Sequence, residues 1–173
     1  LLTLGYNVKM VDHAESGRAG ISKGVLGIAL DAANTNVGIF ADLISKDVPL
    51  VGLEPSAILT FRDEYLRLAT DKESANEIAK HSYTIEEFIK LEFDKGNIKS
   101  ESFSKENLTI KVHEHCQQKS LSTTENTFKM LSIPENYNVT ILNTGCCGMA
   151  GSFGYEKEHY KISMQVGEDT LFP

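Results

Sequence analysis

Two adjacent cysteines, Cys146 and Cys147, are the residues of this sequence best suited to carry chemistry. They follow an apolar run and precede a glycine-rich stretch, residues 148–154. A disulfide between sequence neighbours would need a strained ring, because bridged Cα atoms usually lie about 4.4–6.8 Å apart. Two thiolates on a backbone that glycine makes permissive suit a metal ion or an iron–sulfur cluster. The alternative is a pair of inert or redox-active thiols.

The third and last cysteine, Cys116, also comes just after an apolar run. A buried structural thiol is its alternative role. His113 and His115 flank it, and either could ligate a metal or hydrogen-bond a thiolate, although an ordinary loop histidine is the simpler interpretation. Lys119 could offset the negative charge of a cluster, or it could be a plain surface lysine. Cys116, Cys146 and Cys147 therefore form a candidate set of soft metal ligands on two loops.

Strands are needed to place these two loops. Because helical patterns alternate with apolar runs, the sequence predicts an α/β fold with a mainly parallel sheet. The carboxyl ends of parallel strands host binding sites, and both cysteine loops follow predicted strands. The four apolar runs predicted to be strands are residues 8–11, 49–53, 108–112 and 139–142.

The remaining segments have helical patterns. Residues 19–44 predict one long helix or two, Pro55 suits the first turn of a helix from about Ser56, and Pro134 ends a later one. A last helix is expected over residues 155–166. Ser or Thr three residues ahead of Glu predicts helix starts at Thr70–Glu73, Thr84–Glu87 and Ser122–Glu125.

The middle of the chain is acidic and polar, which predicts a solvated helical hairpin. Gly96 is expected to terminate its second helix, and a polar connection follows over residues 97–107. The predicted organisation is a first half over residues 1–65, this helical connection over 66–107, and a second, cysteine-bearing half over 108–173.

The two halves share a short repeat. Residues 8–20 align without gaps on residues 139–151, with four identical positions, and each copy predicts a strand, a turn and a glycine-assisted helix start. The pattern indicates two related Rossmann-like βαβ halves. Glu15 and Ser16 stand where the second copy has its cysteine pair, so the first half would have lost its thiolates. Glu15, Arg18 and Arg62 could form a buried ion pair there instead.

Composition excludes several classes of protein. The chain has 173 residues, 41% of them hydrophobic, which suits a single globular core. A formal net charge of −7 without a basic stripe argues against nucleic acid as a partner. Three cysteines do not make a disulfide framework, and a reducing compartment is expected. No apolar run reaches transmembrane length, and the start without Met suggests a piece of a longer protein.

The cysteine motifs resemble a known family. Residues 145–156 (Gly-Cys-Cys-Gly-Met-Ala-Gly-Ser-Phe-Gly-Tyr-Glu), with residues 113–119 upstream, resemble the cysteine-rich CCG domain. This domain occurs in heterodisulfide reductase and in the iron–sulfur subunits of glycolate oxidase and anaerobic glycerol-3-phosphate dehydrogenase. Residues 15–18 and 54–65 extend the resemblance across the chain, most closely to the C-terminal region of fused FAD-linked D-lactate or 2-hydroxyacid dehydrogenases.

The resemblance implies a ligand set and a reaction. Cys116, Cys146 and Cys147 would bind an iron–sulfur cluster together with a further cysteine-bearing segment beyond Pro173. Gln117, where relatives commonly have histidine, and Ala57, where a ligand-bearing copy has cysteine, depart from the family pattern. The present chain alone is therefore expected to hold no complete cluster and to be inactive.

The parent protein would oxidise a 2-hydroxyacid at FAD. Electrons would pass through ferredoxin-type clusters and this region to a quinone or another carrier. Since no Gly-x-Gly-x-x-Gly follows a strand here, FAD is assigned to another domain of the same or a partner chain. The expected location is cytoplasmic, or peripheral on the inner face of the membrane through the parent protein. A zinc-binding or metal-free docking module of the same enzyme is the alternative function.

Overall fold

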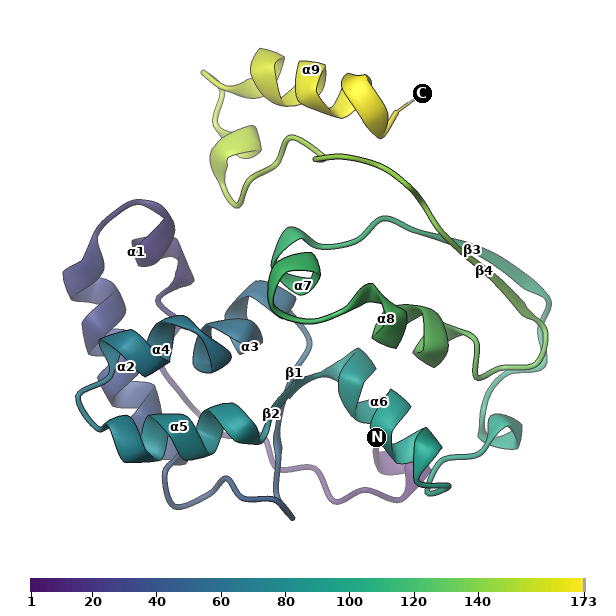
Figure 1. Ribbon diagram of the computed structural model, residues 1–173, viewed down its shortest axis with the longest axis horizontal. Helices are drawn as coiled ribbons and strands as arrows, with labels where there is room; N and C mark the ends of the chain where they lie inside the picture. Colours follow the sequence, from purple (N-terminus) through teal and green to yellow (C-terminus); the bar gives the residue numbers. More distant parts are fainter. Residues whose placement is uncertain (173) are drawn as a thin grey trace.

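The computed structural model of the chain describes residues 1–172 (Figure 1). It consists of helices and pairs of parallel strands. β1 (Leu50–Gly52) pairs with β2 (Ser82–Thr84), and β3 (Leu108–Val112) pairs with β4 (Tyr137–Ile141). Helices connect the two members of each pair, as parallel pairing requires. The predicted mixture of helices and parallel strands is confirmed.

The helices fall into an N-terminal and a C-terminal set. The N-terminal set is η1 (Leu2–Leu4), α1 (Arg18–Ser22), α2 (Leu26–Phe40), α3 (Pro55–Arg62), α4 (Glu64–Leu68), α5 (Lys72–Lys80) and α6 (Ile85–Asp94). The C-terminal set is η2 (Ser100–Ser102), α7 (Cys116–Leu121), α8 (Thr124–Leu131), η3 (Phe153–Tyr155) and α9 (Tyr160–Thr170).

The strand pairs form two separate sheets, so the prediction of one mainly parallel sheet is wrong. The predicted strand at residues 8–11 is extended chain without strand pairing. Its apolar side chains are not buried, since Val8 is 38% exposed and Met10 is 90% exposed. β1 pairs instead with the unpredicted strand β2, where Ser82 and Thr84 are buried although polar.

The second half agrees better with the sequence. β3 has the predicted bounds, and β4 covers most of residues 139–142 but begins two residues earlier. Each sheet thus belongs to one strand–helix–strand unit. That the two units are Rossmann-like copies of each other stays a prediction, as does the division of the chain into three segments. Pro173 lies outside the described residues.

The hydrophobic core lies among the N-terminal helices. Leu59 and Tyr65 of α3 and α4 are buried against Phe40 of α2 and Ile78 of α5. The Phe61 ring lies 5.7 Å from that of Phe40 and 4.5 Å from that of Tyr65. Because its side chains are buried in this core, α3 provides a fixed surface for the elements that pack on it.

Several helix ends differ from the prediction. The capping box at Thr84 and Glu87 is confirmed, and Gly96 follows α6 with a left-handed φ of +78° as expected of a terminating glycine. Asp71 rather than Thr70 caps α5, and Thr123 rather than Ser122 caps α8. Each miss is one residue, because two neighbouring polar residues compete for the cap.

The other helices also differ in extent. Of the two alternatives for residues 19–44, two helices are confirmed: α1 and α2 are separated at Gly24, which has a left-handed φ of +73°, and α2 ends at Phe40. α9 begins at Tyr160, not at residue 155, because residues 153–155 form the short 3₁₀ turn η3. The predicted helical hairpin in the middle of the chain is interrupted by β2.

The N-terminal segment is tied to α6. The Tyr6 hydroxyl donates to Glu92 Oε2 at 2.8 Å, and the Tyr6 ring meets Phe88 edge-on at 5.2 Å. Burial, together with the neighbouring Glu92 carboxylate, raises the pKa of Tyr6 to about 12. Tyr6 thus anchors the chain just before the predicted strand, and Val11 within it packs against the hydrophobic core.

Candidate functional site

Both cysteine loops leave the same edge of the β3–β4 sheet. Val112 and Ile141 are partners in the parallel register, and the Leu142 N–H donates to the Val112 carbonyl at 2.9 Å. Cys116 and the pair Cys146–Cys147 follow these two strand ends within a few residues. The predicted arrangement of two cysteine segments beyond neighbouring parallel strands therefore has its structural basis in this register.

Cys116 is the first residue of α7, a helix that the sequence did not predict. The His115 side chain caps it, since His115 Nδ1 accepts from the Gln117 N–H at 3.2 Å. Cys116 itself is exposed. α7 escaped prediction because its six residues include a single large aliphatic side chain, Leu121, which is too little for a recognisable helical stripe.

The Cys146–Cys147 loop has no regular secondary structure and rests against α9. The Gly145 N–H donates to Thr170 Oγ1 at 2.9 Å, and the Gly148 N–H donates to Cys146 Sγ at 3.3 Å. Cys146 is exposed and Cys147 is half-buried. Gly148 has a φ of +82°, and a Cβ at this position would lie 2.2 Å from the Ser163 carbonyl oxygen. Glycine is required there because the loop touches the backbone of α9.

His113 joins the two cysteine loops. Its Nδ1 lies 2.7 Å from Thr144 Oγ1, and the Lys119 ammonium donates to the Thr144 carbonyl at 3.4 Å. Lys119 also lies 3.7 Å from the Glu114 carboxylate. Thr144 is thus a contact residue that sequence reasoning missed, and nothing in its sequence surroundings marked it. Among the two histidines, His113 bridges the loops and His115 caps α7.

The three cysteines suit a thiophilic metal by their chemistry, and all three are free thiols. Within residues 1–172 there is no group of three or more His, Cys, Asp or Glu side chains gathered closely enough to hold a metal ion. The structure therefore brings the two cysteine segments to one sheet edge and links them through His113, without assembling the thiols into a closed ligand set.

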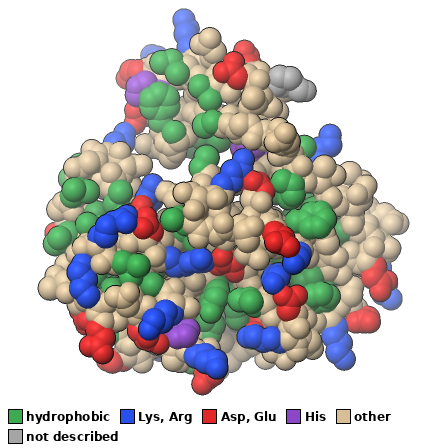
Figure 2. All heavy atoms as spheres, viewed as in Figure 1, with side chains coloured by type: hydrophobic (Ala, Val, Ile, Leu, Met, Phe, Trp, Pro, Cys, Tyr) green, Lys and Arg blue, Asp and Glu red, His purple; other side chains and the backbone are tan. Residues whose placement is uncertain are grey.

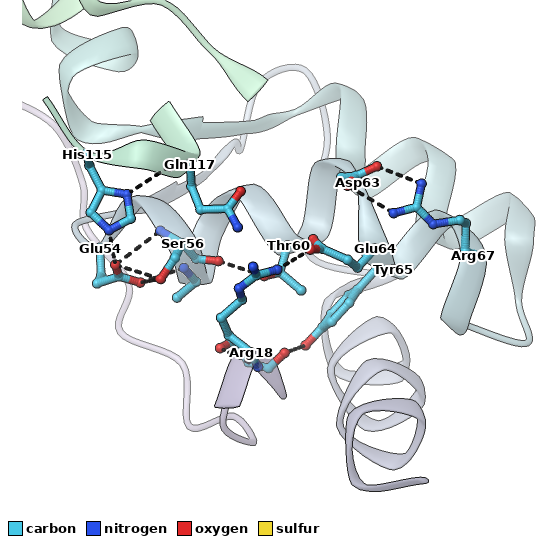
Figure 3. Close-up of polar contacts among 12 residues, drawn as sticks. Arg18, Glu54, Ser56, Thr60, Asp63, Glu64, Tyr65, Arg67, His115 and Gln117 are labelled. Carbon is cyan, nitrogen blue, oxygen red and sulfur yellow. Dashed lines mark hydrogen bonds and ion pairs between the residues drawn. The ribbon is translucent and has the colours of Figure 1, made fainter. Parts of the chain in front are cut away.

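The corresponding region of the first half holds ion pairs. Glu15 is exposed, and the predicted ion pair between it and Arg18 or Arg62 is wrong. Arg18 pairs with Glu64 (Figure 3). Arg62 pairs with Glu87 at 2.7 Å. These two glutamates lie on α4 and α6, which the core brings beside the arginines.

The amino end of α3 is filled by its own cap. Glu54 accepts from the N–H groups of Ser56, at 3.1 Å, and Ala57, at 2.6 Å (Figure 3). His115 Nε2 lies 3.7 Å from Glu54 Oε1, so the amino ends of α3 and α7 face each other. Ala57 therefore contributes a backbone donor to a carboxylate cap.

The surface carries mixed charge. On the face shown in Figure 2, Lys and Arg side chains are interspersed with Asp and Glu side chains. Among the described residues, no helix combines the length and the apolar content that crossing a membrane requires.

Comparison with known proteins finds relatives among dehydrogenases. The chain is 26% identical to "D-2-hydroxyglutarate dehydrogenase" of Haemophilus influenzae over 94% of its own length and 16% of the relative. It is 26% identical to one of the subunits of anaerobic glycerol-3-phosphate dehydrogenase of Escherichia coli K12 over 85% of its own length and 36% of the relative. It is 24% identical to "D-2-hydroxyglutarate dehydrogenase" of Pseudomonas putida over 96% of its length and 16% of the relative.

The chain thus spans about a sixth to about a third of the length of these relatives. No family model matches the chain. No solved structure matches it either. The relatives support an oxidoreductase region, in agreement with the class of protein that the cysteine motifs indicate.

Proposed function

We propose that this chain is an electron-transfer region of a larger dehydrogenase, in which Cys116, Cys146 and Cys147 ligate an iron–sulfur cluster. The observation that carries the proposal is the shared edge of the β3–β4 sheet, from which both cysteine segments emerge. The His113–Thr144 contact at 2.7 Å supports it, because it links the two segments where a common site would need them together.

The chain's own residues supply thiolates and the groups that stabilise them. The Gly148 N–H donates to Cys146 Sγ, and such donors stabilise negative charge on sulfur. Lys119, which donates to the Thr144 carbonyl and pairs with the Glu114 carboxylate, places a positive charge near the loops. When bound, the cluster would supply one-electron transfer. Three cysteines leave at least one position of a four-thiolate set to a group outside residues 1–172.

The parent enzyme is proposed to oxidise a 2-hydroxyacid at FAD in another domain. Electrons would reach this region through ferredoxin-like domains and leave to a quinone or another carrier. The dehydrogenase relatives and the CCG resemblance support this assignment. The proposed location is the cytoplasm, or the inner face of the membrane through partner domains.

A zinc-binding or metal-free docking module is the second candidate. The metal-free form is favoured by the arrangement of the thiols, which are not gathered into one group among the described residues. In that function, the two halves would serve as a scaffold for partner domains, and the cysteines would bind zinc or remain free.

Spectroscopy of the anaerobically purified protein, with the parent domains present, separates the two candidates. We expect visible sulfur-to-iron charge-transfer absorption, an EPR signal, and iron and sulfide bound in comparable amounts. A matched protein with Cys116, Cys146 and Cys147 all replaced by Ser should lose the part of the signal that belongs to this region. Equal iron, sulfide and visible absorption in the two proteins, with zinc bound only where the cysteines are intact or with no metal difference at all, would instead support the docking module.

A further inference from the structure

The helix that carries Cys116 has little apolar contact of its own. α7 is six residues long, and isolated helices of that length are unstable in water. Leu121 packs partly against the core, and the buried Gln118 donates to Thr127 Oγ1 of α8 at 2.7 Å. Polar contacts from other elements must therefore contribute much of what keeps α7, and with it Cys116, in place.

Side chains of the first half hold both ends of α7. At its amino end, Arg18 lies 2.5 Å from the Gln117 amide oxygen in the orientation that satisfies both groups, and Glu54 lies beside His115 (Figure 3). At its carboxyl end, Arg62 Nη2 donates to the Leu121 carbonyl at 3.2 Å. This carbonyl belongs to the last turn of the helix, where backbone acceptors lack helical partners.

Glu87 is the acceptor on which the carboxyl end of α7 depends. Its side chain is 9% exposed and receives Arg62 Nη1 at 2.8 and 2.7 Å. It also accepts from the Thr84 N–H at 3.0 Å and from the hydroxyl of Ser122, the residue that follows α7. One carboxylate thus joins α6, α3 and the end of α7, and it orients the guanidinium that caps Leu121.

We propose that Glu87 is a positioning residue for Cys116. It acts through Ser122 and Arg62, which fix the carboxyl end of α7 and thereby the position and orientation of its first residue, Cys116. The consequence of this positioning for metal binding rests on the proposed function. The positioning itself concerns the metal-free chain and is tested there.

The test measures the distance between Cys116 and Cys146 by pulsed EPR. Spin labels are attached to both thiols of the metal-free chain, with Cys147→Ser in every sample. We expect Glu87→Gln and Ser122→Ala to broaden the distance distribution roughly twofold, because α7 samples more orientations when its anchor is lost. Ser122→Thr, which keeps the hydroxyl, should restore the original distribution. The control Glu125→Gln alters an exposed carboxylate paired with Lys129 on α8 and should change nothing.

The outcomes separate positioning from general stability and from metal binding. Urea unfolding of each variant establishes that the labelled samples are folded, and if Glu87→Gln does not fold, Ser122→Ala decides. A distribution that stays unchanged in the folded variants overturns the proposal. Broadening in Ser122→Thr as much as in Ser122→Ala also overturns it. Because no metal is present, failure of the proposed cluster function would leave this result unaffected.

Discussion

Replacing Gly148 by Ala is expected to release α9 from the Cys146–Cys147 loop. The new Cβ would meet the Ser163 carbonyl oxygen at 2.2 Å, and neither backbone can move aside as a flexible side chain would. The φ of +82° adds strain of about 1–3 kcal/mol for a residue with a Cβ. Amide exchange over α9 should accelerate by about tenfold or more, corresponding to about 1.4 kcal/mol of lost local stability.

Gly24→Ala is the matched control for this substitution. Gly24 has a similar φ of +73°, but a Cβ there would meet nothing within 4 Å. The Gly24→Ala variant should therefore show the backbone strain without any change in amide exchange over α9. Equal protection of α9 in the two variants would contradict the claim that the loop is held by close contact with that helix.

Arg62→Met should cause the largest loss of global stability. It removes the guanidinium from the nearly buried Glu87 carboxylate and leaves the Leu121 carbonyl without its side-chain donor. Unpairing a fully buried charge costs about 3–5 kcal/mol, and since 28% of the Arg62 side chain is exposed we expect about 2–3 kcal/mol. Urea unfolding followed by circular dichroism measures this loss.

Lys129→Met provides the comparison for Arg62. Lys129 pairs with Glu125 on the surface of α8, where both side chains are about half exposed. Its loss should change the free energy of unfolding by less than about 1 kcal/mol. Similar losses in the free energy of unfolding for the two substitutions would mean that water solvates Glu87 when Arg62 is absent. That result would contradict the anchoring role of the Arg62–Glu87 pair.

The strands of the second half were predictable because they are apolar runs bounded by polar turns. Residues 108–112 form β3 as predicted, and Pro134 lies beyond the end of α8. The register of β3 and β4 then brings both cysteine segments to one sheet edge, as a parallel arrangement requires. The capping box at Thr84 was visible for the same reason, since it depends on local sequence alone.

Elements whose stability comes from tertiary contacts were not predictable. Residues 8–11 look like a strand but have no strand partner, and this part of the chain contacts the rest through the Tyr6–Glu92 hydrogen bond and the packing of Val11 on the core. β2 has buried hydroxyl side chains and so lacks an apolar pattern. α7 depends on ion pairs from distant parts of the chain.

The residues of the candidate site were likewise predictable only in part. The cysteines and the glycine turn were evident from residue type alone. The contacts that arrange them come from Thr144, Ser163 and Thr170, whose roles depend on how α9 packs on the loop. The same limit applies to Glu87, because a surface glutamate and a buried acceptor have the same sequence signature.

The most direct test of a shared site is the protection of the three thiols by metal. Protein purified anaerobically with its parent domains is treated with a thiol-alkylating reagent before and after iron removal, and modification is quantified at each cysteine by mass spectrometry. We expect Cys116, Cys146 and Cys147 to be protected together and to become reactive together when iron is removed. Cys116 reacting at the same rate in both states, while Cys146 and Cys147 respond, would contradict a site shared by the two loops.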